Sequence, residues 1–474
     1  MTEKADVRTL TNPMMMSFRF HKAMMALAIL FLPIWGSVMD GRGPLGSLGG
    51  LASFYPLLLG CFIWSIQAVF FQRKIYFPKN VGTYPVLLFL LAIIISFIVN
   101  IQEIWTMNFN GAPASTRFFI QFGTMLMLML ILLYMTNFFK AALNSGQDIF
   151  AFINRYMTLS VCISVVYSFF EIGAHFLGIT AFESVLSIFQ LLYLSGGGYQ
   201  SFRLQSLAYE PSFFIQYVVI VLPWLVVNIV YSSKKRKIFY LILTAIVCLM
   251  VFLTFSRSGY PIILLEIIML LFFFRKKISI VKGMILICMF IGALSLLFAS
   301  VGLEYDLDSF LHVFDTIFII EGVSNITRWA SQLAGWYIFL DYPITGVGWG
   351  LFGFYAPDYF PSWGWASPEI QMTGLNGGGR LSPPFGLYTR LLSEVGAVGF
   401  ACFMLIFFYT TKNLYALINN KKICELHRAF LFACVVFLTA FFVLGFTSDN
   451  LYNWGAWGVV TLVWALTNRY IQEN

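Results

Sequence analysis

Residues 238–274 decide the fold of this chain and read IFYLILTAIVCLMVFLTFSRSGYPIILLEIIMLLFFF. Two apolar runs, 238–254 and 260–274, flank a short link that contains Arg257. Each run approaches the ~20 residues that a helix needs to cross about 30 Å of hydrocarbon. Because a cation at bilayer depth costs at least ~3 kcal/mol, Arg257 needs a stabilising partner. The planar guanidinium group suits phosphate better than the lysine ammonium does, so the stretch points to two membrane helices whose connection meets a lipid phosphate.

Composition places the chain among the polytopic membrane proteins. Of 474 residues, 59% are hydrophobic and 11% are charged, with a mean hydropathy of +0.82. A soluble core does not account for so much apolar surface. The sequence predicts an all-α protein with about twelve transmembrane helices, near residues 23–39, 51–71, 85–101, 118–138, 156–178, 212–231, 238–254, 260–274, 283–301, 385–410, 429–447 and 452–467.

Basic clusters predict the orientation. Residues 234–237, 275–277 and 421–422 are rich in lysine and arginine, which is typical of cytoplasmic turns. With twelve spans, both termini then lie in the cytoplasm. The same topology makes every outer cation an arginine: Arg42, Arg117, Arg203, Arg257, Arg328, Arg380 and Arg390. The net charge of +8 therefore reflects membrane topology, and we do not interpret it as nucleic-acid binding.

The cysteines and histidines predict neither disulfides nor a metal site. All seven cysteines fall in predicted spans or in a cytoplasmic turn, so disulfides are not expected. The chain has four histidines and lacks a C-x-x-C pattern, so we expect no metal and no cofactor.

Two long outer loops separate the predicted spans. The first covers about residues 179–211. The second, residues 302–384, is inserted between the ninth and tenth spans of a single membrane domain, residues 1–474. Loops of this length are usually functional or disordered. Asn325 is predicted to cap a helix over about residues 326–340 within the second loop.

Two arginines come just before predicted helix starts. Arg257 precedes a helix whose first turn can accept Pro261 without losing a hydrogen bond, and the unpaired N–H groups there favour an anion. Arg203 and Glu210-Pro211 repeat this arrangement at the sixth span. Two alternatives remain open: an Arg257 that only reaches lipid headgroups, and a Glu210 that only complements the helix dipole.

Other arginines of the outer face are candidates of the same kind. Arg328 lies beside Trp329 on the predicted loop helix, where a salt bridge is the alternative reading. Arg380 and Arg390 flank the start of the tenth span, where each could instead be a lipid-headgroup anchor.

Three ionisable groups fall inside predicted spans. Glu266 interrupts the eighth span, and Glu171 and His175 share one face of the fifth. A neutral, hydrogen-bonded carboxyl explains Glu266 as well as a functional one does, and a structural pair is favoured over a proton relay for the other two. These groups keep a transporter open as an alternative.

Four segments resemble the signatures of the O-antigen polymerase and ligase superfamily, in the expected order. They are Arg203 with Glu210-Pro211-Ser212, Thr254-Phe255-Ser256-Arg257-Ser258-Gly259, Arg328 with Pro343-Ile344-Thr345-Gly346-Val347-Gly348, and Leu391-Leu392-Ser393-Glu394-Val395-Gly396. Ligases usually carry His-Asn nine residues ahead of the last glutamate, where this chain has Phe385-Gly386. The resemblance is therefore closer to the O-antigen polymerases.

The resemblance implies an inverting, metal-independent glycosyltransferase at the periplasmic face of the bacterial inner membrane. It would join undecaprenyl-pyrophosphate-linked repeat units, a donor and an acceptor, into O-antigen or a similar surface polysaccharide. Membrane lipids and a chain-length regulator protein are further candidate partners. An O-antigen ligase, which transfers glycan to the lipid A core, is the alternative within the family. A twelve-span glycan or solute transporter is the alternative from another class.

The implied chemistry assigns roles to named residues. Arg203, Arg257, Arg328 and Arg380 would hold the donor pyrophosphate, and Arg257 would also stabilise its departure. Glu210 is the first candidate for the base that deprotonates the acceptor hydroxyl. Further candidates for a base or a supporting group are His312 and Glu394. Loop tryptophans such as Trp329 and Trp336 would stack on sugars, or serve as core or interfacial anchors.

Overall fold

A computed structural model describes residues 13–35, 46–70, 75–78, 81–109, 111–190, 203–277, 323–374 and 381–472. Nearly all regular structure in these residues is helical, as predicted. The helices are α1 Pro13–Leu30, α2 Phe54–Phe70, α3 Tyr84–Val99, α4 Ile101–Thr106, α5 Ala114–Asn144, α6 Ile149–His175, α7 Thr180–Gln190, α8 Pro211–Tyr231, α9 Lys234–Leu253, α10 Gly259–Phe273, α13 Val323–Asp341, α14 Phe352–Tyr359, α15 Pro368–Gly374, α16 Leu387–Ile418, α17 Glu425–Leu444 and α18 Trp454–Thr467.

Short elements complete the described chain. A small antiparallel hairpin pairs β1 Asn108–Phe109 with β2 Ala112–Pro113. Three single turns are 3₁₀-helical and a fourth is π-helical: η1 Gly46–Gly50, η2 Val81–Thr83, η3 Ser362–Ala366 and η4 Asn468–Gln472.

The structure confirms an all-α membrane protein. Among the described residues, six helices are long and apolar enough to cross a bilayer: α5, α6, α8, α9, α16 and α17. The shorter apolar helices α2, α3 and α10 lie at other predicted spans. The first predicted span is displaced, because α1 ends at Leu30 and is followed by a turn. The ninth predicted span, residues 283–301, lies outside the described residues.

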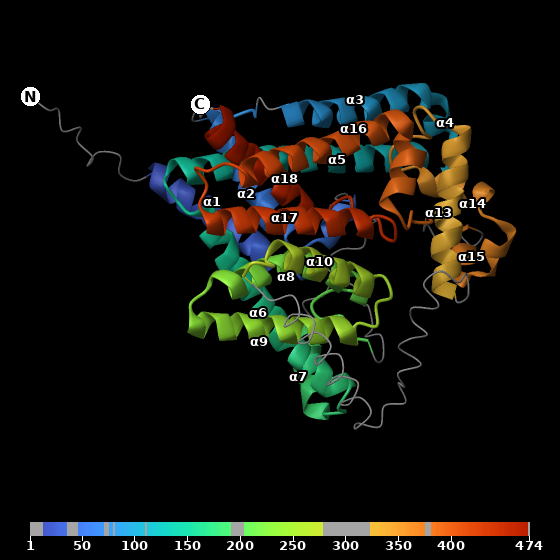
Figure 1. Cartoon of the computed structure of the whole chain (residues 1–474). Coiled ribbons are helices and arrows are strands. Elements are labelled where there is room, and N and C mark those ends of the chain that lie inside the picture. The colour runs from blue at the N-terminus through green and yellow to red at the C-terminus, as the bar shows by residue number, and fades with distance from the viewer. Residues whose placement is uncertain are drawn as a thin grey trace, which may run out of the picture.

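The apolar helices run side by side and α13 crosses one end of them (Figure 1). Helix α8 lies at the centre, packed against α9, α17 and α10, so it is buried on nearly every side. On the flanks, α3 packs along α16 and α5 packs along α18. The central position of α8 matters for the site, because its N-terminus carries Glu210 towards the end that α13 covers.

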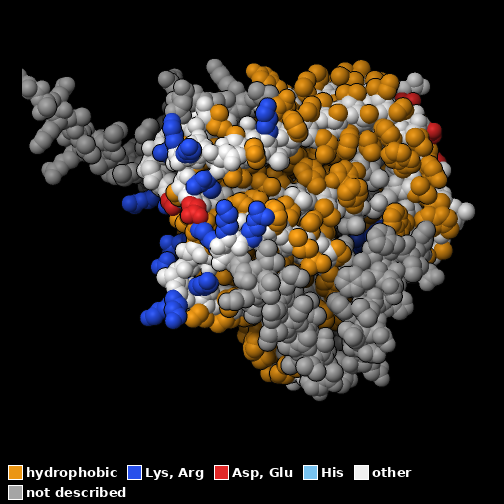
Figure 2. All heavy atoms as spheres, in the orientation of Figure 1, with side chains coloured by type: hydrophobic (Ala, Val, Ile, Leu, Met, Phe, Trp, Pro, Cys, Tyr) orange, Lys and Arg blue, Asp and Glu red, His pale blue; other side chains and the backbone are white. Residues whose placement is uncertain are grey.

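The basic turns gather at one end of the bundle, and apolar side chains cover the flank that Figure 2 shows. The Glu425 carboxylate joins three elements there. It lies 2.7 Å from Lys277 Nζ and accepts a hydrogen bond from the Tyr231 hydroxyl at 3.1 Å. These contacts bring the end of α8, the turn after α10 and the start of α17 together. Helices α13 to α15 lie at the other end (Figure 1).

The predicted loop helix exists, but its predicted cap is wrong. Helix α13 covers Val323–Asp341 and ends before Pro343, as expected. Asn325 lies inside this helix instead of at its start. A sequence that begins with Val323-Ser324-Asn325 continues as helix because the face formed by Thr327, Ala330 and Ala334 is buried, with Thr327 hydrogen-bonded to Ser367 and Ala330 next to Gly364 of η3.

Candidate functional site

The segment around Arg203 is fixed by a buried carboxylate. Glu171 of α6 accepts hydrogen bonds from the backbone N–H groups of Gln205 and Ser206, each at 2.8 Å. Ser206 has a φ of 53°, a left-handed conformation that is unfavourable for a residue with a side chain. The two hydrogen bonds that the Glu171 carboxyl group accepts offset that cost. Glu171 therefore shapes the arginine segment, a role that the predicted pairing with His175 did not include.

The Arg203 segment is joined directly to the Arg257 link. Arg203 Nε donates to the Thr254 carbonyl oxygen at 3.0 Å, and the Leu204 N–H donates to the Leu253 carbonyl at 2.9 Å. Phe255 has a φ of 47°, so the link is strained between these bonds and Arg257. Two sequence segments that were predicted to repeat one arrangement thus lie side by side.

A glycine sets the spacing of the two helix starts. A Cβ at Gly259, the first residue of α10, would lie 2.8 Å from Ile215 Cδ1 of α8, too close for any larger residue without a shift. The N-termini of α8 and α10 therefore meet in close contact. Pro211 begins α8 and Pro261 lies in the first turn of α10, as predicted. Arg257 is exposed just before α10.

Glu210 occupies the N-cap position of α8 without capping it through its side chain. Within the described residues, its carboxylate makes no hydrogen bond to the N–H groups of the first turn. It accepts a hydrogen bond from the Ser212 hydroxyl at 3.2 Å. Glu210 therefore does not cap α8 by a side-chain hydrogen bond, and its place at the helix start agrees with a carboxylate that complements the helix dipole.

Arg328 reaches the same place from α13. Its Nη1 donates to the Thr447 carbonyl oxygen at 3.2 Å, and its guanidinium lies 5.7 Å from the centre of the Phe385 ring. The neighbouring Ser331 and Gln332 side chains fix α13 by donating to backbone carbonyls of residues 383 and 446 at 2.9 and 2.8 Å. Helix α13 thus places one arginine at the end of the bundle.

Electrostatic interactions link these side chains into one group. Burial lowers the pKa of the Arg203 guanidinium; Glu210 opposes this shift, while Arg328 and Arg257 add to it. Burial also lowers the pKa of Arg328. Glu210 and Glu369 oppose that shift, and Arg257 adds to it. We call Arg203, Arg257, Arg328, Glu210 and Glu369 the arginine cluster. Its three cations outnumber its two carboxylates, so the cluster favours a further anion.

Glu369 is the member of the cluster that sequence reasoning missed. It belongs to α15, which η3 and a hydrogen bond between the Thr327 and Ser367 hydroxyls hold against α13. Burial by the surrounding protein and the nearby Glu210 raise the pKa of Glu369, and Arg328 lowers it. Glu369 lies outside every motif quoted above, and nothing in its sequence position distinguishes it from the other acidic residues of the loop.

Two of the resembling motifs form a backbone clasp instead of a ligand surface. Helix α16 is broken at Gly396, which has a φ of 64°. The freed carbonyls of Ser393 and Glu394 accept hydrogen bonds from Val347 and Gly348 at 2.9 and 3.0 Å. Gly346 has a φ of 65°, and a Cβ there would lie 2.4 Å from the Glu394 carbonyl carbon. Gly346 and Gly396 are required by this close backbone contact, because a Cβ at either position would meet the backbone of the other segment.

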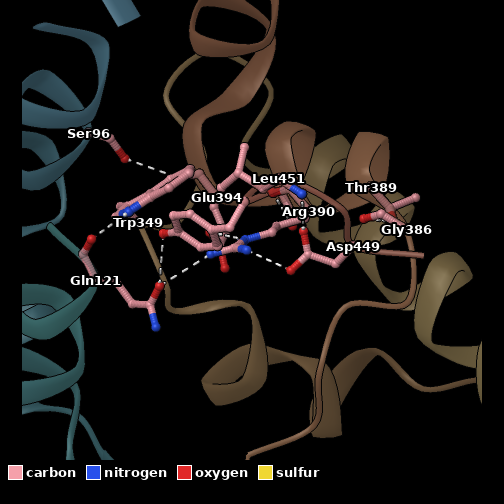
Figure 3. Close-up of polar contacts among 11 residues, drawn as sticks. Ser96, Gln121, Trp349, Gly386, Thr389, Arg390, Glu394, Asp449 and Leu451 are labelled. Atoms are coloured by element: carbon pink, nitrogen blue, oxygen red, sulfur yellow. Dashed lines mark hydrogen bonds and ion pairs between the residues drawn. The ribbon is translucent and has the colours of Figure 1, made fainter. Parts of the chain in front are cut away.

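Arg390 and Glu394 support the clasp from inside (Figure 3). Arg390 is 4% exposed, with Nη1 2.6 Å from Asp449 Oδ2 and Nε 3.2 Å from Glu394 Oε2. Its guanidinium also lies 5.0 Å from the centre of the Trp349 ring. Arg390 is therefore no headgroup anchor, and the geometry favours Glu394 as a supporting group over a base. We call Arg390, Glu394, Asp449 and the segments around Gly346 and Gly396 the clasp.

The remaining predicted residues fall into two sets. Arg380 and His312 lie outside the described residues. Trp329 and Trp336 are exposed on α13, whereas Trp349 is fully buried and donates to the Gln121 carbonyl oxygen. Across the ranges that the structure describes, no group of three or more His, Cys, Asp or Glu side chains is placed to hold a metal ion.

Comparison with known proteins adds nothing to the resemblance, which rests on the quoted residues alone. Neither the protein-family models nor the curated protein sequences gave a match to the chain. The function therefore has to be argued from the arginine cluster and its setting.

Proposed function

We propose that this protein is an inverting, metal-independent glycosyltransferase that polymerises undecaprenyl-pyrophosphate-linked repeat units of O-antigen or a similar surface polysaccharide. The observation that carries the proposal is the convergence of Arg203, Arg257 and Arg328 at one end of a membrane bundle. They come from three segments far apart in sequence, and their mutual repulsion is relieved by a multivalent anion. A lipid pyrophosphate at a membrane surface has that charge and that location.

The cluster supplies what the departure of a pyrophosphate requires. Guanidinium groups fixed before the reaction stabilise the charge that develops on the leaving group, without reorganisation at the moment of transfer. Arg203 is fixed by the Thr254 carbonyl and Arg328 by the Thr447 carbonyl. Arg257 is the exposed member, and we assign it the closest contact with the leaving phosphate. Orientation of donor and acceptor beside the cluster supplies much of the remaining acceleration.

The proposed topology has twelve spans with both termini in the cytoplasm. It is supported by the basic end of the bundle, which the positive-inside rule assigns to the cytoplasm. The arginine cluster, α13 and α15 then lie at the periplasmic face of the inner membrane, and residues 302–384 form a periplasmic insertion. The proposed partners are the lipid-linked donor and acceptor, the surrounding lipids and a chain-length regulator protein.

Two alternatives remain as second candidates. An O-antigen ligase would use the same donor, but its usual histidine is replaced by Phe385-Gly386. A transporter is favoured by Glu266, which is fully buried in α10 and has no hydrogen-bond partner for either oxygen among the described residues. Transporters usually place such groups near mid-membrane between broken helices, whereas the arginine cluster lies at a helix-end surface.

Reconstitution distinguishes these functions. The purified protein would be given polyprenyl-pyrophosphate-linked glycan extracted from the parent cells after deletion of the gene for this chain. A ladder of longer glycans, lost in Arg257→Ala, supports the polymerase. Transfer that requires added lipid A core supports the ligase, and vesicle uptake without any glycosidic product supports the transporter.

A further inference from the structure

Arg117, near the start of α5, is an arginine that neither the arginine cluster nor the clasp uses. Its Nε is buried and has no hydrogen-bond partner among the described residues. No ion pair joins its guanidinium to a carboxylate in that part of the chain. A charged donor that is removed from water without a partner costs free energy. The fold therefore does not supply what this guanidinium needs.

The position of Arg117 in α5 adds to that cost. It is the fourth residue of Ala114–Asn144, where the positive end of the helix dipole disfavours a cation and favours an anion. The first turn contains no acidic residue, and the N-cap residue is Pro113, whose side chain cannot bond the first N–H groups. An oxyanion is the usual ligand of such a helix start. The guanidinium and the helix start therefore favour the same type of ligand.

Gln121 presents a second unpartnered donor one turn further along the same face of α5. Its side chain is 1% exposed. Oε1 accepts hydrogen bonds from Arg390 Nη2 at 3.4 Å and from the Tyr452 hydroxyl at 3.5 Å. Nε2 is buried without a partner among the described residues, and Figure 3 shows it pointing away from Arg390.

Packing fixes the direction of the Gln121 amide. Its main-chain carbonyl oxygen accepts a hydrogen bond from Trp349 Nε1 at 3.2 Å. A Cβ at Gly350 would lie 2.5 Å from Gln121 Cγ, so the segment after Trp349 packs directly on the side chain. Turning the amide over would point its N–H groups at the guanidinium of Arg390, and two donors would then face each other. The unpartnered donor therefore keeps its direction.

The carboxylates of this region already have a cation. Glu394 Oε2 lies 3.2 Å from Arg390 Nε, and Asp449 Oδ2 lies 2.6 Å from Arg390 Nη1. Arg117 interacts electrostatically with Arg390 and with Glu394, so it belongs to the same neighbourhood. Water can satisfy an amide, but a guanidinium next to a second guanidinium is stabilised by negative charge.

We propose that Arg117 Nε and Gln121 Nε2 form a binding site for one oxyanion, the phosphate or carboxylate group of a ligand that approaches the start of α5. Both donors come from one helix face, and both are directed at an acceptor that the described residues do not provide. The site is distinct from the arginine cluster, because it lies on α5 beside the clasp. It does not depend on the proposed glycosyltransferase activity, since the claim concerns binding alone.

Thermal unfolding of the purified full chain in detergent tests the site, with phosphate, glucuronate or chloride as the anion at constant ionic strength. Phosphate should raise the unfolding temperature of the parent protein above its value in chloride, because a ligand of the folded state stabilises it. Phosphate also stabilises proteins by exclusion from their surface, and it can bind the arginine cluster. The measured quantity is therefore the part of the shift that Arg117→Gln loses and Arg155→Gln, at an exposed arginine of α6, retains.

Gln121→Glu places an anion at the site from within the protein. One carboxylate oxygen keeps the contacts with Arg390 and Tyr452, and the other replaces Nε2 on the face that Arg117 shares. In chloride this variant should unfold at a higher temperature than the parent, and phosphate should add only the shift that Arg117→Gln retains.

Gln216→Glu on α8 is the matched control for Gln121→Glu. Gln216 is also 1% exposed, and among the described residues it makes no hydrogen bond to an arginine. A carboxylate buried there without a cation should lower the unfolding temperature.

The outcomes decide the proposal. Equal phosphate shifts in the parent protein, Arg117→Gln and Arg155→Gln would overturn it. So would a Gln121→Glu protein that unfolds at a lower temperature than the parent and keeps the full phosphate shift. A specific shift with phosphate alone supports a phosphate ligand, and a specific shift with glucuronate supports the carboxylate of an acidic sugar. If Arg117→Gln does not fold, Gln121→Glu decides the question.

Discussion

Arg257 in the arginine cluster and Arg390 in the clasp lie at the same end of the bundle, and the loop after α17 contacts both regions. Arg390 is 4% exposed and bonds two carboxylates of its own chain, Glu394 and Asp449. Arg257 is exposed and adds to the repulsion felt by Arg203 and Arg328. In the clasp two carboxylates face one buried arginine, whereas in the cluster three arginines face two carboxylates.

This contrast distinguishes residues with a structural role from residues with a functional role, although both sets resemble signatures of one family. An arginine whose partners are all internal stabilises a difficult backbone arrangement, here a helix broken at Gly396. Three neighbouring arginines repel one another, and a bound external anion would stabilise them. Substituting an arginine should therefore destabilise the fold in the clasp and reduce activity in the cluster. Four substitutions test this difference.

The largest effect is expected where the clasp closes. Gly396→Val puts a side chain 2.3 Å from the Ile344 carbonyl carbon, in a backbone conformation with a φ of 64°. The steric clash and the backbone strain both act on a segment that cannot move without breaking α16. We therefore expect no folded protein by fluorescence-detected gel filtration. Gly123→Val on α5 is the control, because a Cβ there meets no atom within 4 Å among the described residues. A folded Gly396→Val protein would contradict the clasp.

Removing Arg390 should be the next most damaging change to stability. Arg390→Ala leaves Glu394 buried without its cation, which costs about 3–5 kcal/mol for a buried ion pair. Thermal unfolding in detergent measures the loss. The double variant Arg390→Ala with Glu394→Ala should lose less than the sum of the single variants, because Glu394 is no longer a buried carboxylate without its cation and only Asp449 still loses its partner. Additive losses would show that the two side chains do not act as a pair.

Arg257→Lys should leave the fold intact and reduce polymer formation by about 10²-fold, since a preorganised bidentate contact to the leaving phosphate is lost. Product ladders from equal amounts of reconstituted protein measure this effect. Arg275→Lys, an exposed arginine at the basic end, is the control. Near wild-type polymer formation by Arg257→Lys would contradict a role for the arginine cluster in the reaction.

The smallest of the four effects is expected for Glu210→Gln. The substitution keeps the shape of the side chain but removes the charge that attracts Arg203 and Arg328. Loss of about 1.5 kcal/mol, typical of one charge-assisted hydrogen bond, corresponds to about a 10-fold lower rate. Glu103→Gln on α4, which is exposed, provides the comparison. Equal rates in the two variants would show that Glu210 has only a structural role at the start of α8.

Hydrophobic periodicity predicted most of the helices because each long apolar run has one low-energy solution in a membrane. It also placed Pro211, Pro261 and Arg257 correctly at helix starts. It could not show that Glu171 binds the Arg203 segment, because that contact joins α6 to a distant loop. Nor could spacing identify Glu369, whose place in the cluster depends on how α15 packs against α13.

The clasp shows a different limit of sequence reasoning. Glycines in the 343–348 and 391–396 segments were recognised as a pattern, but only the structure shows that each is needed by the other. Arg390 looked like a surface residue because it follows a loop by a few positions. Its burial results from the packing of α5, α16 and the loop after α17, which no local pattern records.

Binding of a polyprenyl pyrophosphate to the purified protein is the most direct test of the central claim. Undecaprenyl pyrophosphate without sugar isolates the contact with the arginines from the chemistry of transfer. The account predicts saturable binding that Arg257→Ala weakens at least tenfold, with Arg275→Ala unchanged. Equal binding by the parent protein and Arg257→Ala would contradict it.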